Sequence, residues 1–279
     1  MLVFAKIKSV QDKLNSLKKG ITVGFVPTMG ALHKGHLSLI EKAKRENDLV
    51  IASIFVNPTQ FDKNEDLVNY PKTIDQDLTF LKSIFCDIVF TPTAEEIYEN
   101  NITSQPFLFD GLEFEMEGKF RTGHFDGVGT IVKRLFEVVK PHSAYFGEKD
   151  FQQLQIIRKM VEKHHLPVKI VGCPIYREED GLAMSSRNTR LSPEHRAAAP
   201  FIYKTLKEVK IKFGTKSAAE VCEWVNKKFE NHSLLKLEYF EIADENNLKS
   251  ISIKNAQSKY RAFIAVFAEK IRLIDNISL

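Results

Sequence analysis

The chain has 279 residues, of which 43% are hydrophobic and 27% charged, and its formal net charge is +4. This composition is that of a globular protein, and the length predicts one large and one smaller domain. The small positive excess suits anionic substrates, but it is too small to indicate nucleic-acid binding by itself.

The three cysteines have no regular spacing, which argues against a disulfide framework or a zinc module and favours a reducing compartment. The first residues lack the apolar core of a signal peptide, and no apolar run approaches membrane-spanning length. We therefore expect a cytoplasmic protein that binds neither a membrane nor nucleic acid.

A helix and a buried strand are expected first. Residues 9 to 19 carry helical signals, with Ser9 as a possible N-cap and Gly20 as a stop. The β-branched and aromatic residues between positions 21 and 26 predict a parallel strand that ends at Pro27 and runs into a loop.

The loop after this strand contains Gly30 and Gly35, which let the backbone pass close to a ligand. His33 and His36 fall where the loop becomes a helix, because apolar residues recur at helical spacing from position 37. The N–H groups and positive dipole of a helix amino terminus favour a phosphate, and two imidazoles add donors. Zinc is disfavoured, because no Cys or carboxylate stands nearby at ligand spacing. Ordinary surface histidines are the other alternative.

A second buried strand is predicted from Leu49 to Val56, and it ends in NPTQF. Asn57 and Gln60 then lie at the same sheet edge as the two histidines, provided that the crossover is parallel and right-handed. A simple turn is the alternative for Asn57 and Pro58.

The stretch CDIVFTP predicts a third strand. Before it, Asp75 and Asp77 are expected to face solvent in a helix, with help in placing a metal as the alternative. Further on, Lys119, Arg121 and His124 form a basic group. Its partner is either an acidic ligand or the glutamates at positions 113, 115 and 117.

Residues 142 to 146 predict a short strand, with Gly147 as the turn and a helix that starts around Glu148 to Asp150. Lys149 and Gln153 are four apart, so they share one face if both are helical. After a charged link near residue 180, helices at 193 to 212 and 217 to 230 precede strand-like runs. This pattern predicts a small α+β domain of helices on an antiparallel sheet.

Five motifs in this order resemble those of the pantothenate synthetase family: PTMGALHKGH, NPTQF followed by NEDLVNYPKT, FRTGHF, GEKDFQQ and MSSRN. The first contains the His-x-Gly-His signature of the adenylyl-transferring superfamily that includes class I aminoacyl-tRNA synthetases. The resemblance implies an α/β fold, with a Rossmann-like parallel-sheet domain at residues 1–176 and a smaller α+β lid domain at 177–279.

The resemblance also implies an ATP-dependent ligase that joins pantoate to β-alanine through a pantoyl adenylate, releasing pyrophosphate and AMP. It implies catalytic roles for His33, His36 and Lys149. Gln60 would bind pantoate and β-alanine, Gln153 would bind pantoate, and Asn57 would support them. The implied ATP contacts are Met29, Gly30, Ala31, Leu32, His33, Lys34, Gly35, His36, Gly147, Glu148, Lys149, Asp150, Tyr176, Met184, Ser185, Ser186 and Arg187.

Some features stay open at this stage. Tyr176 stands where the family usually has a smaller aliphatic residue, and Ser185 and Ser186 have helix capping as their plain alternative. The resemblance implies Mg²⁺ as cofactor, with no protein ligand identified, and a homodimer. The alternative functions are an adenylylating enzyme for another carboxylate and an RNA-binding module on the same fold.

Overall fold

The computed structural model describes residues 1–61, 67–99 and 101–279. Part of the predicted NEDLVNYPKT match, residues 64–66, lies outside the described residues. The chain divides into two compact units. The first comprises Met1–Glu113, Glu117–Glu148 and Gln153–Pro174, and the second comprises Phe114–Met116, Lys149–Gln152 and Ile175–Leu279.

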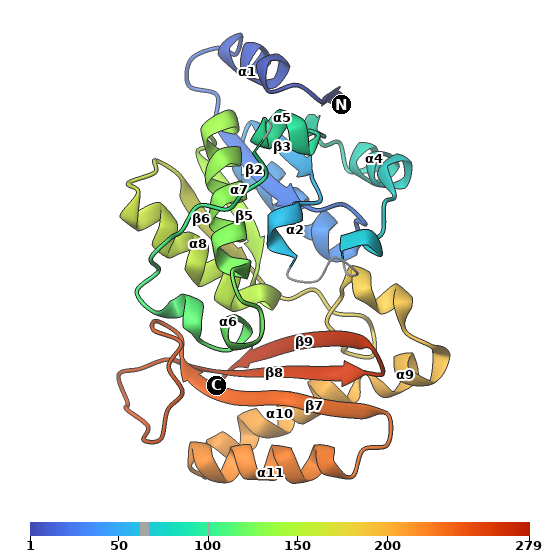
Figure 1. The fold of residues 1–279 in the computed structure, drawn as a ribbon, viewed down its shortest axis with the longest axis vertical. Helices are drawn as coiled ribbons and strands as arrows, with labels where there is room; N and C mark the ends of the chain where they lie inside the picture. The colour runs from blue at the N-terminus through green and yellow to red at the C-terminus, as the bar shows by residue number, and fades with distance from the viewer. Residues whose placement is uncertain (62–66, 100) are drawn as a thin grey trace. The chain divides into compact units, whose positions relative to one another are not determined.

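The first unit contains a six-stranded parallel sheet with the order β1-β4-β3-β2-β5-β6 (Figure 1). Because parallel strands need crossover connections, helices cover both faces of the sheet. The strands are β1 (Leu2–Phe4), β2 (Val23–Thr28), β3 (Leu49–Ile54), β4 (Ile88–Phe90), β5 (Ser143–Gly147) and β6 (Lys169–Cys173).

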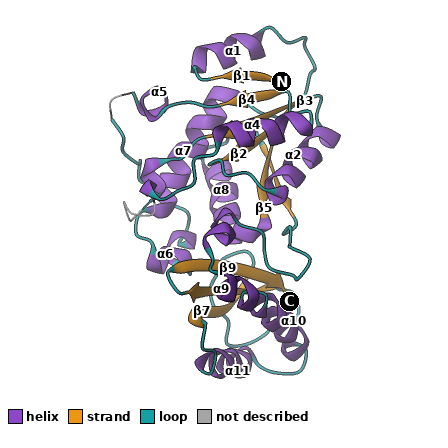
Figure 2. Ribbon diagram, turned by 90° about the vertical axis from the view of Figure 1, so that its right-hand side faces the viewer, coloured by secondary structure: helices purple, strands orange, loops and turns teal. Residues whose placement is uncertain are grey.

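Helices pack on both faces of this sheet (Figure 2). On one face, Ile40 and Leu81 of α2 and α4 share an apolar core with Val50 of β3. On the other face, the ring of Phe136 in α7 contacts Phe25 edge-on, at 6.3 Å between centroids. The helices are α1 (Ile7–Asn15), α2 (Lys34–Glu46), α4 (Ile74–Ser83), α5 (Ala94–Tyr98), α6 (Glu117–Phe120), α7 (His124–Val139) and α8 (Phe151–Lys163), with 3₁₀ turns η1 (Pro58–Gln60), η2 (Leu112–Phe114) and η3 (Glu148–Asp150).

Strand order reverses beside β2. The chain moves from β2 to β3 in one direction and from β5 to β6 in the other, although β2 and β5 are neighbours. In open α/β sheets, ligands bind outside the carboxyl ends of the strands at such a reversal. The loop that carries His33 leaves β2 at this point, so the topology puts the histidines at the expected ligand position.

The second unit is an antiparallel sheet covered by helices. Its strands β7 (Leu235–Asp244), β8 (Tyr260–Ala268) and β9 (Ile271–Ser278) pair in the order β7-β8-β9. Apolar residues of the helices and the sheet form one core, which includes Leu206, Val225 and Ile264. The helices are α9 (Pro193–Ala198), α10 (Phe201–Phe213) and α11 (Ala218–Glu230), and η4 (Ser186–Arg190) precedes them.

The α/β class with a smaller α+β part is confirmed, but three local predictions were wrong. The first helix begins at Ile7, before Ser9, because the Glu96 carboxylate accepts the Ile7 N–H at 2.8 Å and takes the place of a serine cap. The predicted helix at 193–212 is divided near Pro200, which has no N–H for a helical hydrogen bond.

Strand β2 also continues through Pro27 to Thr28 instead of ending at Pro27. Pro27 lies opposite Ser53 of β3, whereas β5 pairs with β2 only at Gly24 and Phe25. At its carboxyl end β2 therefore has a partner on one side, and a residue without an N–H is tolerated there.

Within the described part of the chain, no helix has the length and apolar character needed to cross a bilayer.

Candidate active site

The loop between β2 and α2 has a left-handed backbone at two consecutive residues. Gly30 has φ +83° and Ala31 has φ +49°. Glycine adopts this region freely, whereas an alanine there is strained and has to be held by its surroundings. The hydroxyl of Thr28 begins to hold the loop, because it accepts the Gly30 N–H at 3.2 Å and donates to the Ser53 carbonyl at 2.7 Å.

Asp77 of α4 supplies the main support for this loop. Its carboxylate accepts the N–H groups of Ala31 at 3.0 Å and Leu32 at 2.7 Å, and the Thr73 hydroxyl at 3.2 Å. The residue is only 1% exposed. The expectation that Asp77 faces solvent was therefore wrong, because the amides of Leu32 and Ala31, 45 and 46 positions away, satisfy the buried carboxylate. Asp75, two residues earlier, is exposed as predicted.

The two histidines occupy the first turn of α2. His33 is the N-cap residue, and its N–H donates to Nδ1 of His36 at 3.3 Å. The two rings lie close, with centroids 4.0 Å apart and planes inclined by 33°. Since Nδ1 of a neutral His36 accepts this bond, the proton of the ring is on Nε2, which becomes the donor.

Asn57 is buried at the start of η1. Its Nδ2 donates to the Gly127 carbonyl at 3.2 Å, and its Oδ1 accepts the Tyr98 hydroxyl at 2.5 Å. Burial raises the pKa of Tyr98, which keeps the proton on the donating oxygen. Asn57 thus holds the η1 turn that carries Gln60, and no sequence pattern indicated its partner Tyr98.

Arg121 and His124 hold the other side of the same turn. The main-chain carbonyl of Gln60 lies 2.9 Å from Nδ1 of His124 and accepts from Nη2 of Arg121 at 3.3 Å. Arg121 also pairs with Glu117, at 3.9 Å between Nη1 and Oε2. The FRTGHF motif therefore fixes the backbone of a predicted substrate-binding residue, a role that the sequence left open.

Gly127 allows α7 to approach this turn closely. A Cβ at this position would lie 2.1 Å from the Thr59 carbonyl oxygen and 3.0 Å from the Gln60 nitrogen. Both atoms belong to the backbone, so a methyl group forces the turn and the helix apart.

The sheet brings several predicted residues of the first unit to one edge. β2 pairs in parallel with both β3 and β5. His33 and Gln60 follow β2 and β3, and Gly147 ends β5, so all three residues lie at the same edge of the sheet, as predicted for the first two strands. Gln153 lies in the first turns of α8, one residue after the buried Gln152.

The predicted residues of the second unit form local contacts. Nζ of Lys149 lies 3.6 Å from Oδ1 of Asp150. The Tyr176 carbonyl accepts the Met184 N–H at 3.0 Å, which connects two predicted ATP-contact positions. Ser185 is the N-cap of η4, with its Oγ accepting the Arg187 N–H at 3.2 Å, so the capping alternative describes its conformation in this structure.

Neither a cysteine nucleophile nor a protein-built metal cage is present in the described residues. Burial raises the pKa of Cys86 and of Cys173 to about 11 and also raises the pKa of Cys222, so all three are neutral thiols near pH 7. The residues with described positions include no group of three or more His, Cys, Asp or Glu side chains placed to hold a metal ion.

The model of the Pantoate-beta-alanine ligase family matches residues 2–278. The chain belongs to the pantoate–β-alanine ligase family. It is 57% identical to the pantothenate synthetase of Flavobacterium psychrophilum over 281 aligned positions, which cover 100% of both chains. It is 46% identical to that of Aquifex aeolicus, with 99% and 98% covered.

Solved structures of this family have the same fold. Pantothenate synthetase from Thermus thermophilus superposes with a TM-score of 0.91 at 40% identity and covers 99% of each chain. The pantoate–β-alanine ligase of Francisella tularensis, crystallised with "Beta-gamma ATP" and β-alanine, gives 0.84 at 38% identity and covers 100% of this chain and 97% of that one. The ligase of pantothenate biosynthesis predicted from the five motifs is thus confirmed.

The role of Asp77 can be tested through stability. Asp77→Ala leaves two loop amides without their charged acceptor, and we expect the free energy of unfolding in urea to fall by about 3 kcal/mol. Asp75→Ala is the matched control, because this exposed carboxylate lies on the same helix, and we expect it to cost under about 1 kcal/mol. Equal losses in the two variants would contradict the support that we assign to Asp77.

The close approach at Gly127 also predicts a measurable loss. Helix propensity alone would make Gly127→Ala stabilising by about 1 kcal/mol. Because the methyl group meets backbone atoms, we expect a net loss of about 2 kcal/mol in chemical denaturation. Gly129→Ala is the comparison variant, because its Cβ would meet ring atoms of Phe107 and Phe109 and no backbone atom, and we expect a smaller loss. A gain in stability for Gly127→Ala would refute the contact.

Proposed function

We propose that this ligase acts in two steps through a pantoyl adenylate. In the first step, a carboxylate oxygen of pantoate attacks the α-phosphorus of ATP. The bond between that phosphorus and the oxygen that bridges the α- and β-phosphates breaks, and pyrophosphate is released. In the second step, the amine of β-alanine attacks the acyl carbon and AMP leaves. Neither step requires a protein nucleophile, so the protein positions the reactants and stabilises charge on phosphate oxygens.

The histidine pair at the amino end of α2 is the observation that carries this proposal. The N–H groups of Lys34 and Gly35 belong to the first turn of the helix, where backbone donors have no helical acceptor. Together with the N–H at Nε2 of His36, they form a set of donors for phosphate oxygens. We propose that His33 and His36 stabilise the charge that develops on the α-phosphate.

The amides of Ala31 and Leu32 have a different part in the site. Their N–H groups already donate to Asp77. In the first part of the motif, the contacts to ATP that we propose are therefore made by Met29, by the carbonyl groups of the loop, by the imidazole of His33 and by the backbone N–H groups that begin at Lys34.

We propose Gln60 and Gln153 as the residues that bind the acid substrates. The amide of Gln60 would contact pantoate and β-alanine, Gln153 would contact pantoate, and Asn57 holds the η1 turn that presents Gln60. The Francisella tularensis ligase was crystallised with "Beta-gamma ATP" and β-alanine, which supports β-alanine as a ligand of this chain.

The remaining proposed ATP contacts come from two motifs. Lys149 would neutralise phosphate charge, and Asp150 would accept from ribose hydroxyls. Arg187 offers a planar fork for phosphate oxygens, and Ser185 and Ser186 add neutral donors. The other proposed contacts are Gly147, Glu148, Tyr176 and Met184.

Four further features stay predictions: three come from the family resemblance, and the cytoplasmic location comes from the cysteine content and composition of the sequence. These are Mg²⁺, the homodimer, the cytoplasmic location and a lid role for residues 177–279, with a catalytic domain at 1–176. Mg²⁺ in nucleotide enzymes is commonly held by substrate phosphates, water and one or two carboxylates. The phosphate oxygens of ATP therefore suit it without a protein cage, and it would neutralise their charge.

The proposed catalytic roles predict a loss of rate without a loss of fold. We expect His36→Ala and Lys149→Ala each to slow single-turnover pyrophosphate release by about 10²–10³, since each removes one donor to the reacting phosphate. The exposed His164, at the end of α8, gives a control variant, His164→Ala. Circular dichroism checks the fold of each variant, and a rate near that of the unmodified chain would remove the residue from the catalytic set.

The reaction itself is tested by pyrophosphate release from ATP and Mg²⁺ on addition of pantoate, with and without β-alanine. We expect pyrophosphate to appear with pantoate alone in an amount close to that of enzyme. AMP and pantothenate should follow only when β-alanine is added. A protein that binds ATP but releases no pyrophosphate with pantoate, while another carboxylate supports release, would refute the substrate assignment.

A further inference from the structure

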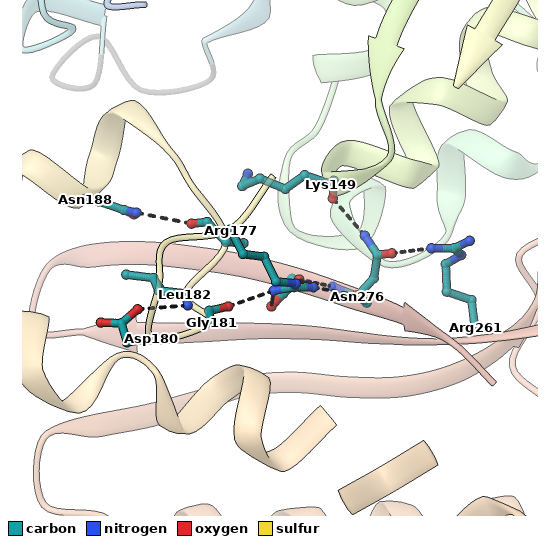
Figure 3. A network of polar contacts seen from close by, with 10 residues as sticks. Lys149, Arg177, Asp180, Gly181, Leu182, Asn188, Arg261 and Asn276 are labelled. Atoms are coloured by element: carbon teal, nitrogen blue, oxygen red, sulfur yellow. Dashed lines mark hydrogen bonds and ion pairs between the residues drawn. The ribbon is translucent and has the colours of Figure 1, made fainter. Parts of the chain in front are cut away.

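The side chain of Asn276, near the end of β9, contacts the backbone of Lys149. Its Nδ2 donates to the Lys149 carbonyl oxygen at 2.9 Å, although the two residues lie 127 positions apart in the sequence (Figure 3). Both belong to the second unit. Asn276 is 1% exposed, so this hydrogen bond is shielded from competing water.

The other end of the Asn276 amide is held as well. Its Oδ1 accepts from Nη1 of Arg261 at 2.6 Å. Arg261 itself is fixed by Glu245, at 2.8 Å between Nε and Oε1, and by the ring of Phe151, 3.9 Å from its Cζ. The oxygen and the nitrogen of the amide are therefore assigned by their partners, and the amide cannot turn over without breaking both contacts.

The backbone of Asn276 is fixed from its neighbour. Asp275 accepts the Asn276 N–H at 2.7 Å and forms a two-fold pair with Arg177, at 2.7 and 2.9 Å. Burial raises the pKa of Asp275, and the hydrogen bonds from Arg177 oppose this effect. Arg177 also stacks on Tyr203, with its Cζ 3.6 Å from the ring centroid. The donor that reaches Lys149 thus projects from a rigid point.

Lys149 needs such support because its own element is short. It lies in η3, a three-residue turn between β5 and α8. A lysine side chain has four rotatable bonds, so the direction in which its ammonium group points depends first on the placement of its backbone. A displacement of about 1 Å at a catalytic group can cost a hundredfold in rate.

We propose that Asn276 is a positioning residue for Lys149, which it holds through the main-chain carbonyl so that the ammonium group reaches the phosphates of ATP. This inference rests on the proposed function of Lys149. Through Asn276, strand β9 contributes to the first chemical step, although Asn276 itself touches no substrate.

Asn276→Asp is the sharpest variant for this proposal. The carboxylate keeps an acceptor for Arg261 but has no donor for the Lys149 carbonyl, so the contact that matters is removed and the other is kept. We expect kcat for pyrophosphate release, measured with pantoate and β-alanine both present, to fall about tenfold, the usual effect of one lost hydrogen bond, with KM for pantoate changed less than twofold. Asn276→Ala is the second variant, because it brings no new charge close to Asp275.

Two comparisons separate positioning from general stability. In the first, Asn276→Asp is combined with Lys149→Ala in a double-mutant cycle. If Asn276 acts through the lysine, it has no effect once the ammonium group is gone, whereas a structural role would lower the rate tenfold again. In the second comparison, Arg272→Gln is the control. Arg272 lies in β9, as Asn276 does, and its substitution removes an ion pair with Glu238 of β7 but should leave kcat unchanged.

Each outcome has a defined meaning. A loss in Asn276→Asp that disappears in the Lys149→Ala background supports the proposal. Losses that multiply in the double variant overturn it, as does an unchanged kcat in folded Asn276→Asp beside an impaired Lys149→Ala. Normal pyrophosphate release in Lys149→Ala would overturn the proposed role of Lys149 and this inference with it.

Discussion

The loop between β2 and α2, which carries His33, depends on the hydrogen bonds that the buried Asp77 carboxylate accepts. A loop with consecutive left-handed residues at Gly30 and Ala31 is strained at the alanine, and a charge-assisted pair of hydrogen bonds offsets that strain. Because the same loop ends at the N-cap of α2, the position of His33 follows from a side chain on a different helix.

At the η1 turn, too, the residue proposed to bind substrate is held in place by other side chains. Gln60 is the residue proposed to contact substrate. The side chains of Arg121 and His124 contact its main-chain carbonyl, and the side chain of Asn57 donates to the Gly127 carbonyl. Gly127 completes the arrangement by letting α7 lie against the turn. The FRTGHF motif, which forms a basic cluster in the sequence, therefore has a structural role. The side chains of Arg121 and His124 contact the carbonyl oxygen of Gln60 and fix the η1 turn.

In the second unit, two neighbouring residues of β9 also hold segments that carry predicted site residues. Asn276 binds the Lys149 carbonyl, and the neighbouring Asp275 binds Arg177, the residue that follows Tyr176. Consecutive strand residues leave opposite faces of a sheet, so β9 serves two segments at once. Both segments carry predicted ATP contacts, which makes the last strand a common support for them.

The α/β class and the ligase family could be predicted from the sequence, since strand-length apolar runs and five ordered motifs are local patterns. The sequence also located His33 and His36 at a helix start, because Gly30 and the following periodicity are local signals. The partners of Asp77 and Asn276 could be identified only in the folded chain. Their contacts join positions 45 and 127 apart, and such pairs leave no trace in spacing or propensity.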